Sequence, residues 1–155
     1  MTTGALTLAN GARIQGLQPD MLRDTLAMAA EFKAATGSNL RINSGYRSTE
    51  HQRMLYKRNP LQAAKPGRSM HEYGLAIDVP TVQADKLAAL GLLRKYRLHR
   101  PLTRAHIRNK EPWHIERVGL DYATIRAKGY TPVIAGGGAL LLGVALILIS
   151  QRGGT

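Results

Sequence analysis

Hydrophobic and polar positions alternate along the chain in patterns that predict short helices and strands in mixed order. Residues 1–16 have no clear period, and we expect them to be loosely structured. A helical period predicts a helix over about 19–36, which Gly37 ends. We expect five residues to lie on the core-facing stripe of this helix or at its border: Leu22, Leu26, Ala29, Ala30 and Lys33.

The remaining elements are shorter, and they include both types. We expect a strand over 39–46, a helix from Ser48 or Thr49 to about Asn59, a strand over 75–79, a helix over about 83–96 and a strand over 113–118. Thr49 and Gln52 have capping-box spacing, which supports the start of the second helix. Elements in this order favour a small α+β domain with an antiparallel sheet and flanking helices.

The C-terminal part of the chain has a different character. Residues 133–150, VIAGGGALLLGVALILIS, contain no charged side chain. As a helix these residues would be roughly 27 Å long, about the hydrocarbon thickness of a bilayer, so we expect a transmembrane helix; a buried core helix is the alternative. Ala139 and Gly143 have the small-xxx-small spacing that favours self-association. The expected organisation is a folded domain over 1–125, a linker over 126–132, the span over 133–150 and a tail over 151–155.

Charge and cysteine content narrow the possible partners and metals. The net charge of +12 comes from 22 Lys and Arg against 10 Asp and Glu, and it favours polyanions such as nucleic acid, anionic lipid or an anionic cell wall. The chain has no cysteine, so any metal must be bound by His, Asp or Glu. The N-terminus lacks a basic segment followed by an apolar one, and we expect no cleavable signal peptide.

The segment SMHEYGLAID, residues 69–78, carries the first candidate chemistry. His71 precedes the predicted strand and Asp78 ends it. Alternation places Gly74, Ala76 and Asp78 on one face, where the two small residues predict open space. A histidine and an aspartate that point into one open space can act as two ligands of a divalent metal.

A second segment, EPWHIE over 111–116, supplies further candidates. His114 and Glu116 share one face of the predicted strand, so His114 can complete a His/Asp/His site. Two imidazoles and one carboxylate suit tetrahedral zinc with water in the fourth position. Glu111, three residues before His114, can act as the general base on that water. We interpret the other histidines as structural: His51, His99 and His106.

Three ordered motifs carry a family resemblance. The pattern S-x-H-x-x-G-x-A-x-D followed by E-x-W-H resembles the zinc D-alanyl-D-alanine carboxypeptidases and related peptidoglycan peptidases. This group shares its metal site with lysostaphin-type enzymes and the hedgehog signalling domain. Residues 44–48, SGYRS, with Gln52 after them, are similar to a third element of the family. The resemblance covers about 20–120 and implies the corresponding α+β fold.

The resemblance implies a role for each candidate side chain. One zinc ion would be bound by His71, Asp78 and His114, and Glu111 would be the catalytic base. Arg47 would polarise the scissile carbonyl and stabilise the oxyanion. The residues that would contact the substrate are Arg47, Ser69 and Gln52. The alternatives are a turn serine at 69 and a helix-surface glutamine at 52.

The implied substrate is the peptide of bacterial peptidoglycan, and the resemblance leaves the bond open. A D-Ala-D-Ala carboxypeptidase and an L-Ala-D-Glu-type endopeptidase both fit. Short members of the family resemble bacteriophage endolysins and virion-associated peptidases, here anchored by residues 133–150. Arg126 and Lys128 flank this span, and their charge places the domain initially in the cytoplasm. A basic stripe would favour docking on an anionic wall: Arg94, Lys95, Arg97, Arg100, Arg104, Arg108 and Lys110.

Two other classes of protein compete with the enzyme. A non-catalytic, membrane-tethered wall-binding module could use the same pocket, although it would not need Glu111. A nucleic-acid-binding protein would explain the charge, but not the ordered His/Asp/Glu/His set. With one Phe and one Trp, the chain also has few aromatic side chains on which bases could stack, so nucleic acid is the less favoured partner.

Overall fold

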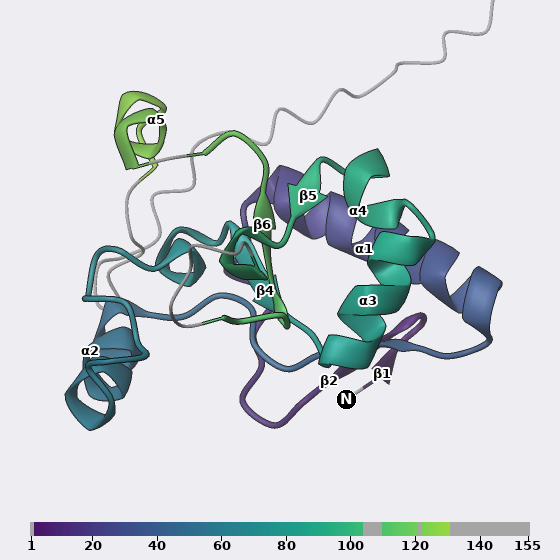
Figure 1. Ribbon diagram of the computed structural model, residues 1–155, viewed down its shortest axis with the longest axis horizontal. Helices are drawn as coiled ribbons and strands as arrows, with labels where there is room; N and C mark the ends of the chain where they lie inside the picture. The colour runs from purple at the N-terminus through teal and green to yellow at the C-terminus, as the bar shows by residue number, and fades with distance from the viewer. Residues whose placement is uncertain (1, 104–109, 121, 131–155) are drawn as a thin grey trace, which may run out of the picture.

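The computed structural model describes residues 2–103, 110–120 and 122–130 of the 155-residue chain (Figure 1). Its elements in chain order are β1 (Thr2–Thr3), β2 (Leu6–Leu8), α1 (Pro19–Thr36), β3 (Leu40–Ile42), α2 (Thr49–Arg58), the 3₁₀ helix η1 (Met70–Tyr73), β4 (Ala76–Asp78), α3 (Thr81–Ala89), α4 (Leu92–Lys95), β5 (Leu98–His99), the 3₁₀ helix η2 (Pro101–Thr103), β6 (His114–Arg117) and α5 (Tyr122–Ala127). Within the described residues they form two small three-stranded sheets with helices around them. The predicted α+β class is therefore confirmed.

The first sheet joins the N-terminus to the middle of the chain. Its order is β1-β2-β3, with β1 and β2 antiparallel and β2 and β3 parallel. The expectation of loose structure over 1–16 is therefore wrong for β1 and β2, and this sheet is mixed rather than antiparallel. Strands this short show no period in the sequence. β2 forms because Leu6, opposite Leu40 in the register, is buried in the core.

The second sheet carries the candidate chemistry. Its order is β4-β6-β5, and both pairs are antiparallel, as predicted. Asp78 lies opposite His114, and His99 lies opposite Glu116. In Figure 1 this sheet lies near the centre of the molecule, with α1, α3 and α4 to one side and α2 and α5 to the other.

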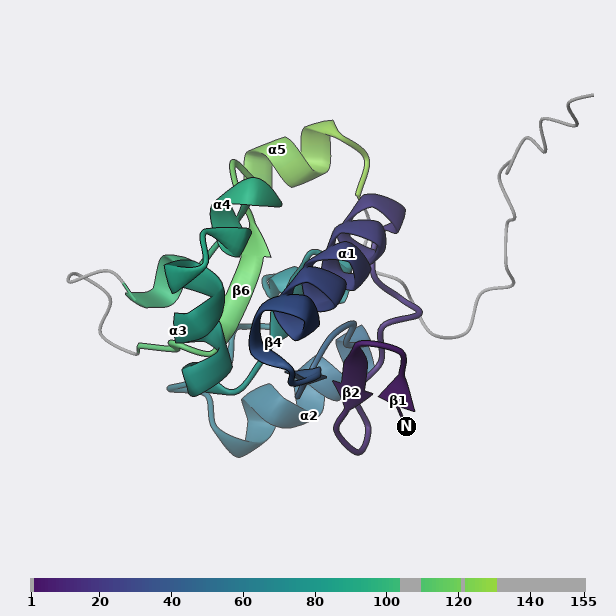
Figure 2. The same ribbon diagram turned by 90° about the vertical axis from the view of Figure 1, so that its right-hand side faces the viewer.

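Helix α1 has the predicted bounds but presents a different face to the core. It ends with Gly37 in the left-handed conformation at φ 72°, and the Gly37 N–H donates to the carbonyl of Lys33. Leu26, expected on or beside the inner stripe, is 43% exposed. The buried side chains are Met21, Thr25, Met28, Ala29 and Phe32. Phe32 and the residues at helical spacing from it therefore determine which face of α1 points into the core. The helix packs beside β2 (Figure 2).

The helix predicted over 83–96 is divided into α3 and α4. Gly91 lies between them in the left-handed conformation, with a φ of 70°. Glycine adopts this conformation at little cost, so the chain turns there and starts a new helix. Leu90, one of the apolar residues of the predicted helix, is consequently 45% exposed.

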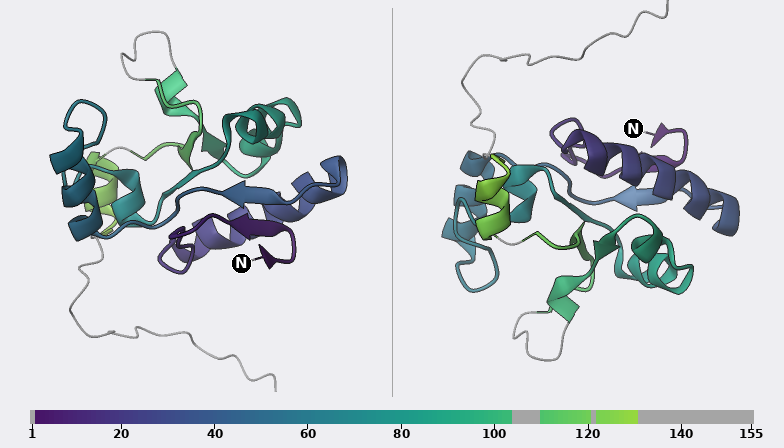
Figure 3. Two further views of the ribbon diagram at one scale, coloured as in Figure 1. Left: turned by 90° about the horizontal axis from the view of Figure 1, so that it is seen from below. Right: turned by 90° about the horizontal axis from the view of Figure 1, so that it is seen from above.

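Two clusters of buried side chains hold these elements together. The larger one includes Phe32 of α1, Ile77 of β4 and Ile115 of β6, each at most 1% exposed. The smaller one packs Leu75 and its neighbours against Ile125 of α5. Helices α2 and α5 lie at the same end of the molecule, away from α3 (Figure 3).

Some predictions concern residues outside the described part of the chain. They are the transmembrane span over 133–150, with Ala139 and Gly143, and the side chains of Arg104, His106 and Arg108. Among the residues that the structure describes, no helix has both the length and the apolar character needed to cross a membrane. The predicted domain boundaries stay predictions.

Candidate active site

The three predicted metal ligands meet at one end of the second sheet. His71 belongs to η1, Asp78 ends β4 and His114 begins β6. His71 Nε2 lies 3.2 Å from His114 Nδ1 and 3.3 Å from Asp78 Oδ1. His114 Nδ1 lies 3.0 Å from the same oxygen, because the antiparallel register places these two residues opposite each other. One ligand atom from each side chain lies within 4.8 Å of the others, an arrangement that can hold a metal ion.

Hydrogen bonds outside this group determine which nitrogen each imidazole presents. His71 Nδ1 lies 2.7 Å from the carbonyl oxygen of Gly45, which can only accept, so Nδ1 donates and Nε2 offers its lone pair. His114 Nε2 lies 3.1 Å from Glu116 Oε2, so Nε2 donates and Nδ1 faces the other ligands. Two imidazole nitrogens and one carboxylate oxygen are a donor set that zinc prefers, with a fourth position open. The three side chains therefore fit a zinc ion.

Burial and charge act in opposite directions on the ligands. Burial disfavours ionised Asp78, but His71 and His114 beside it hold the pKa of Asp78 well below its usual range. Burial also opposes protonation of His114, yet hydrogen bonds to Asp78 and Glu116 raise the pKa of His114 to about 9. Burial lowers the pKa of His71. The carboxylate thus stays ionised and ready to bind a cation.

Arg47 is fixed beside Asp78 by two neutral side chains. Its guanidinium donates to Gln52 Oε1 at 2.8 Å and to Ser44 Oγ at 3.0 Å. One guanidinium nitrogen lies 3.6 Å from Asp78 Oδ2. Gln52 is 1% exposed, and its Nε2 donates to the carbonyl of Ala64 at 2.7 Å. Both ends of the Gln52 amide are thus engaged in holding the site, and its contact with substrate stays a prediction.

A cavity of about 500 Å³ lies beside the ligands. Glu111 is half-buried in its wall, and this burial raises the pKa of Glu111 above the usual range. Ser69 is buried in the same wall, and its backbone N–H donates to the carboxylate of Glu72 at 3.2 Å. The cavity brings together every side chain that the sequence singled out: Arg47, Gln52, Ser69, His71, Asp78, Glu111 and His114.

Two carboxylates that support the site were missed in the sequence. Glu72, fully buried, accepts hydrogen bonds from the Gly67 N–H at 2.9 and 3.0 Å and so shapes the cavity wall. Glu116 was placed on the face of His114 without a role, and it lies 3.5 Å from His99. Alternation on β6 was the available signal for Glu116. Its contact with His99, which we interpreted only as structural, depends on strand pairing that the sequence does not give.

The open space predicted above Gly74 and Ala76 is filled. Ala76 is fully buried, and a Cβ on Gly74 would lie 2.3 Å from the carbonyl oxygen of Gly16. The Gln18 N–H donates to the Gly74 carbonyl at 3.0 Å, so another segment of the chain passes directly against this glycine. Gly74 therefore serves backbone packing, and the cavity lies next to Asp78 instead.

The comparison with protein families identifies the group to which these motifs belong. Residues 15–106, more than half of the chain, match VanY, D-alanyl-D-alanine carboxypeptidase. The chain belongs to this family. The match includes Arg47, His71 and Asp78, whereas Glu111 and His114 follow it. The family membership agrees with the resemblance carried by the sequence motifs.

Three solved structures have similar folds. DacB from Streptococcus pneumoniae D39 is 27% identical, with 74% of this chain and 73% of that chain covered and a TM-score of 0.51. The LdcB LD-carboxypeptidase is 25% identical, with 74% and 71% covered and a TM-score of 0.53. A mutant of the vancomycin resistance D,D-pentapeptidase VanY, in complex with Zn(II), is 25% identical, with 79% and 83% covered and a TM-score of 0.54.

The comparisons also bear on two predictions about chemistry. Membership of the family confirms that the chain is an enzyme. The VanY relative in complex with Zn(II) and the grouping of His71, Asp78 and His114 support the predicted zinc cofactor. The comparison with curated proteins finds no match. The ligand set, the family and the relatives thus agree with the prediction of a zinc peptidase.

Proposed function

We propose that this chain is a zinc-dependent peptidase that hydrolyses an amide bond in the peptide of bacterial peptidoglycan. The observation that carries the proposal is the convergence of a His/Asp/His ligand set with Glu111 and Arg47 around one cavity. A structural metal site would need neither a half-buried carboxylate nor a fixed guanidinium beside open space. The family match supports the substrate class.

Each charged side chain has a separate task in the proposed reaction. Zinc bound by the three ligands would polarise the scissile carbonyl and lower the pKa of water. Glu111 takes a proton from the attacking water and passes it to the leaving amine, and its raised pKa favours this transfer. Arg47, held by Gln52 and Ser44, stabilises the negative charge that develops on the carbonyl oxygen.

Within this class, a carboxypeptidase suits the cavity better than an endopeptidase. Arg68 lines the cavity and is exposed, and it has no ion-pair partner among residues 2–103, 110–120 and 122–130. The substrate of a carboxypeptidase ends in a free carboxylate close to the scissile bond. An unpaired guanidinium can bind such a carboxylate through two parallel hydrogen bonds.

The proposed setting is bacteriophage lysis or wall entry, with the chain anchored in a membrane by residues 133–150. The support is the uncharged run of 18 residues, whose length as a helix matches the hydrocarbon core of a bilayer. The full-length chain should therefore fractionate with membranes and require detergent for release. Recovery of the full-length chain in the aqueous fraction would contradict the anchor.

The experiment that tests the function uses the full-length chain and purified muropeptides. The reaction is run with zinc and with a chelator, and the products are identified by mass spectrometry. We expect loss of a single terminal D-Ala, abolished by the chelator. Internal cleavage with the same zinc dependence would contradict the carboxypeptidase and leave the peptidase in place.

The matched variant for this experiment is Glu111→Ala. It removes the proposed base and leaves all three zinc ligands, so it should bind zinc like the wild type and lose at least about 100-fold in kcat. A zinc-loaded wild type that binds the wall but cleaves nothing would favour the second candidate, a non-catalytic wall-binding module.

A further inference from the structure

Glu116 lies behind His114, on the side of the imidazole that faces away from the other ligands. Its Oε2 is 3.1 Å from His114 Nε2, and its Oε1 is 3.5 Å from His99 Nε2. The carboxylate thus lies between two histidines from neighbouring strands. We propose that Glu116 is a positioning residue that holds His114 in the orientation and tautomer needed for zinc, and that His99 in turn holds Glu116. The inference rests on the zinc site of the proposed function.

The strand register determines this arrangement. Glu116 follows His114 by two residues on β6, so both side chains project from the same face of the sheet. His99 on β5 lies directly opposite Glu116, and Ala76 on β4 lies opposite it on the other side. Ala76, Glu116 and His99 thus lie side by side across the three strands. Because the side chain of Ala76 is small, it leaves room for the Glu116 carboxylate.

A carboxylate in this place has two effects on the imidazole. It only accepts hydrogen bonds when ionised, so His114 Nε2 must carry the hydrogen and Nδ1 keeps its lone pair for zinc. Its negative charge also makes the imidazole a stronger ligand, and outer partners of this kind account for roughly 10–100-fold in metal affinity. In the described part of the chain, His71 has the neutral carbonyl of Gly45 in the equivalent place. The two histidine ligands are therefore not equivalent.

Burial explains why the carboxylate needs both histidines. The side chain of Glu116 is only 13% exposed, and a carboxylate so placed is unfavourable without hydrogen bonds or opposite charge. His114 partners one oxygen and His99 partners the other. Glu116 does not belong to the set of side chains that could bind the metal ion. It therefore acts through His114 rather than on the ion.

Zinc affinity of the full-length chain tests the proposal. Dissociation constants measured by competition with a chromophoric chelator should rise roughly 10–100-fold in Glu116→Ala. Glu116→Gln keeps the shape and one acceptor oxygen but loses the charge, so its loss should be smaller. His99→Gln should also weaken zinc binding, by less than Glu116→Ala, because His99 acts through Glu116.

Two comparisons separate positioning from general stability. Glu50 is an exposed glutamate on α2 that pairs with Arg53, so Glu50→Gln should leave zinc affinity unchanged. The unfolding temperatures of the zinc-free wild type and the zinc-free Glu116→Gln variant should differ little. If Glu116→Ala fails to fold, the zinc affinity of Glu116→Gln provides the test in its place. Unchanged zinc affinity in the Glu116 variants, or losses that only follow a lowered unfolding temperature, would overturn the proposal. A wild type that binds no zinc would contradict the zinc site itself.

Discussion

At the scale of single residues, Gln52 is the neutral side chain on which the geometry of Arg47 depends. Gln52→Ala removes the acceptor that lies 2.8 Å from the Arg47 guanidinium. We expect kcat to fall by roughly 10–100-fold with little change in KM, because the group that stabilises the oxyanion is no longer fixed. Steady-state kinetics on a muropeptide provides the measurement.

The matched control for Gln52 is another glutamine of the same cavity. Gln62 lines the cavity, is exposed and accepts a hydrogen bond from Asn59. The side chains that accept hydrogen bonds from Arg47 in the described residues are Gln52 and Ser44, not Gln62. Gln62→Ala should leave kcat close to that of the wild type. A raised KM at unchanged kcat in Gln52→Ala would show instead that Gln52 contacts the substrate, as the family resemblance implied.

The residues of the site differ in how far the sequence could identify them. The three ligands and Glu111 were found because each has a fixed spacing within a short motif, and alternation on a strand indicates which side chains share a face. Glu116 was placed on the correct face by the same rule. Its link to His99 could not be found, because it requires the pairing of β5 with β6 across an intervening segment. Likewise, the burial of Gln52 depends on the distant backbone at Ala64.

At the scale of elements, Gly74 joins η1 to β4 where two segments of the chain pass close together. It has a φ of 67°, and an added Cβ would lie 2.3 Å from the Gly16 carbonyl oxygen. Gly74→Ala should lower the free energy of unfolding by at least about 2 kcal/mol, because the left-handed conformation costs ~1–2 kcal/mol and a backbone clash adds to it. Urea denaturation measures this loss.

Gly37 provides the control for this substitution. It has a similar φ of 72°, but an added Cβ would meet no atom within 4 Å. Gly37→Ala should therefore cost only the conformational term, about 1–2 kcal/mol. Equal losses in the two variants would contradict the close approach at Gly74.

A link between α1 and β6 makes stability depend on pH. Arg117 donates to Asp24 Oδ2 at 2.7 Å, and although burial opposes ionisation, this hydrogen bond lowers the pKa of Asp24. A carboxyl whose pKa is lower in the folded protein stabilises the fold above its unfolded pKa, and this contribution is lost as the pH falls through the folded pKa. Between about pH 5 and pH 3, the free energy of unfolding should therefore fall more steeply in the wild type than in Asp24→Asn. Parallel curves would contradict the link.

The elements were predictable in proportion to their length. α1 has the expected bounds because its helical pattern repeats over several turns. α2 also begins and ends close to the expected residues, but the predicted capping box of Thr49 and Gln52 is wrong: Ser48 caps the helix by accepting from the His51 N–H, and Gln52 binds Arg47 instead. β1 and β2 contain too few residues to show a period. The break at Gly91 could not be predicted, because a helix tolerates a glycine at a cost of about 1 kcal/mol. The left-handed conformation that ends the helix there is visible only in the folded structure. The rotation of α1 likewise depends on what packs against it.

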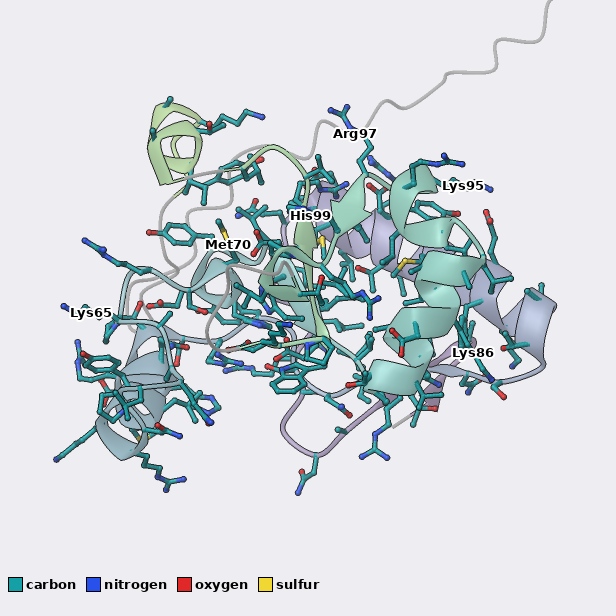
Figure 4. All side chains as sticks on the ribbon, viewed as in Figure 1. Lys65, Met70, Lys86, Lys95, Arg97 and His99 are labelled. Atoms are coloured by element: carbon teal, nitrogen blue, oxygen red, sulfur yellow. The ribbon has the colours of Figure 1, made fainter. Side chains whose placement is uncertain are left out.

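At the scale of the whole molecule, the positive charge is partly balanced where the sequence predicted a basic stripe. Lys95 lies 2.6 Å from Glu31, and Arg100 lies 2.6 Å from Asp85. Arg97 remains exposed on the same side as Lys95 (Figure 4). Docking on an anionic wall stays a prediction, and it would depend on fewer cations than the sequence indicated.

Among the residues that the structure describes, the core and the candidate site extend as far as Tyr130. Ile125 of α5 is fully buried, and Tyr130 packs against the same small cluster. A chain truncated after Tyr130 should therefore keep the unfolding temperature and zinc affinity of the full-length chain, and it should lose membrane association if residues 133–150 are the anchor. Lower zinc affinity in this truncation would mean that residues beyond it support the site.

A shorter chain, truncated after Val118, tests whether α5 belongs to the folded domain. This chain lacks Ile125, whose buried side chain packs in one cluster with Tyr73 and Leu75. Its free energy of unfolding should therefore be lower by at least about 2 kcal/mol. Because Tyr73 and His71 belong to the same 3₁₀ helix, this loosening should also weaken zinc binding. Thermal unfolding and zinc titration of both truncations provide the comparison. If both chains behaved alike, α5 would contribute nothing to the core, and the zinc ligands would be held by the second sheet and the larger cluster alone.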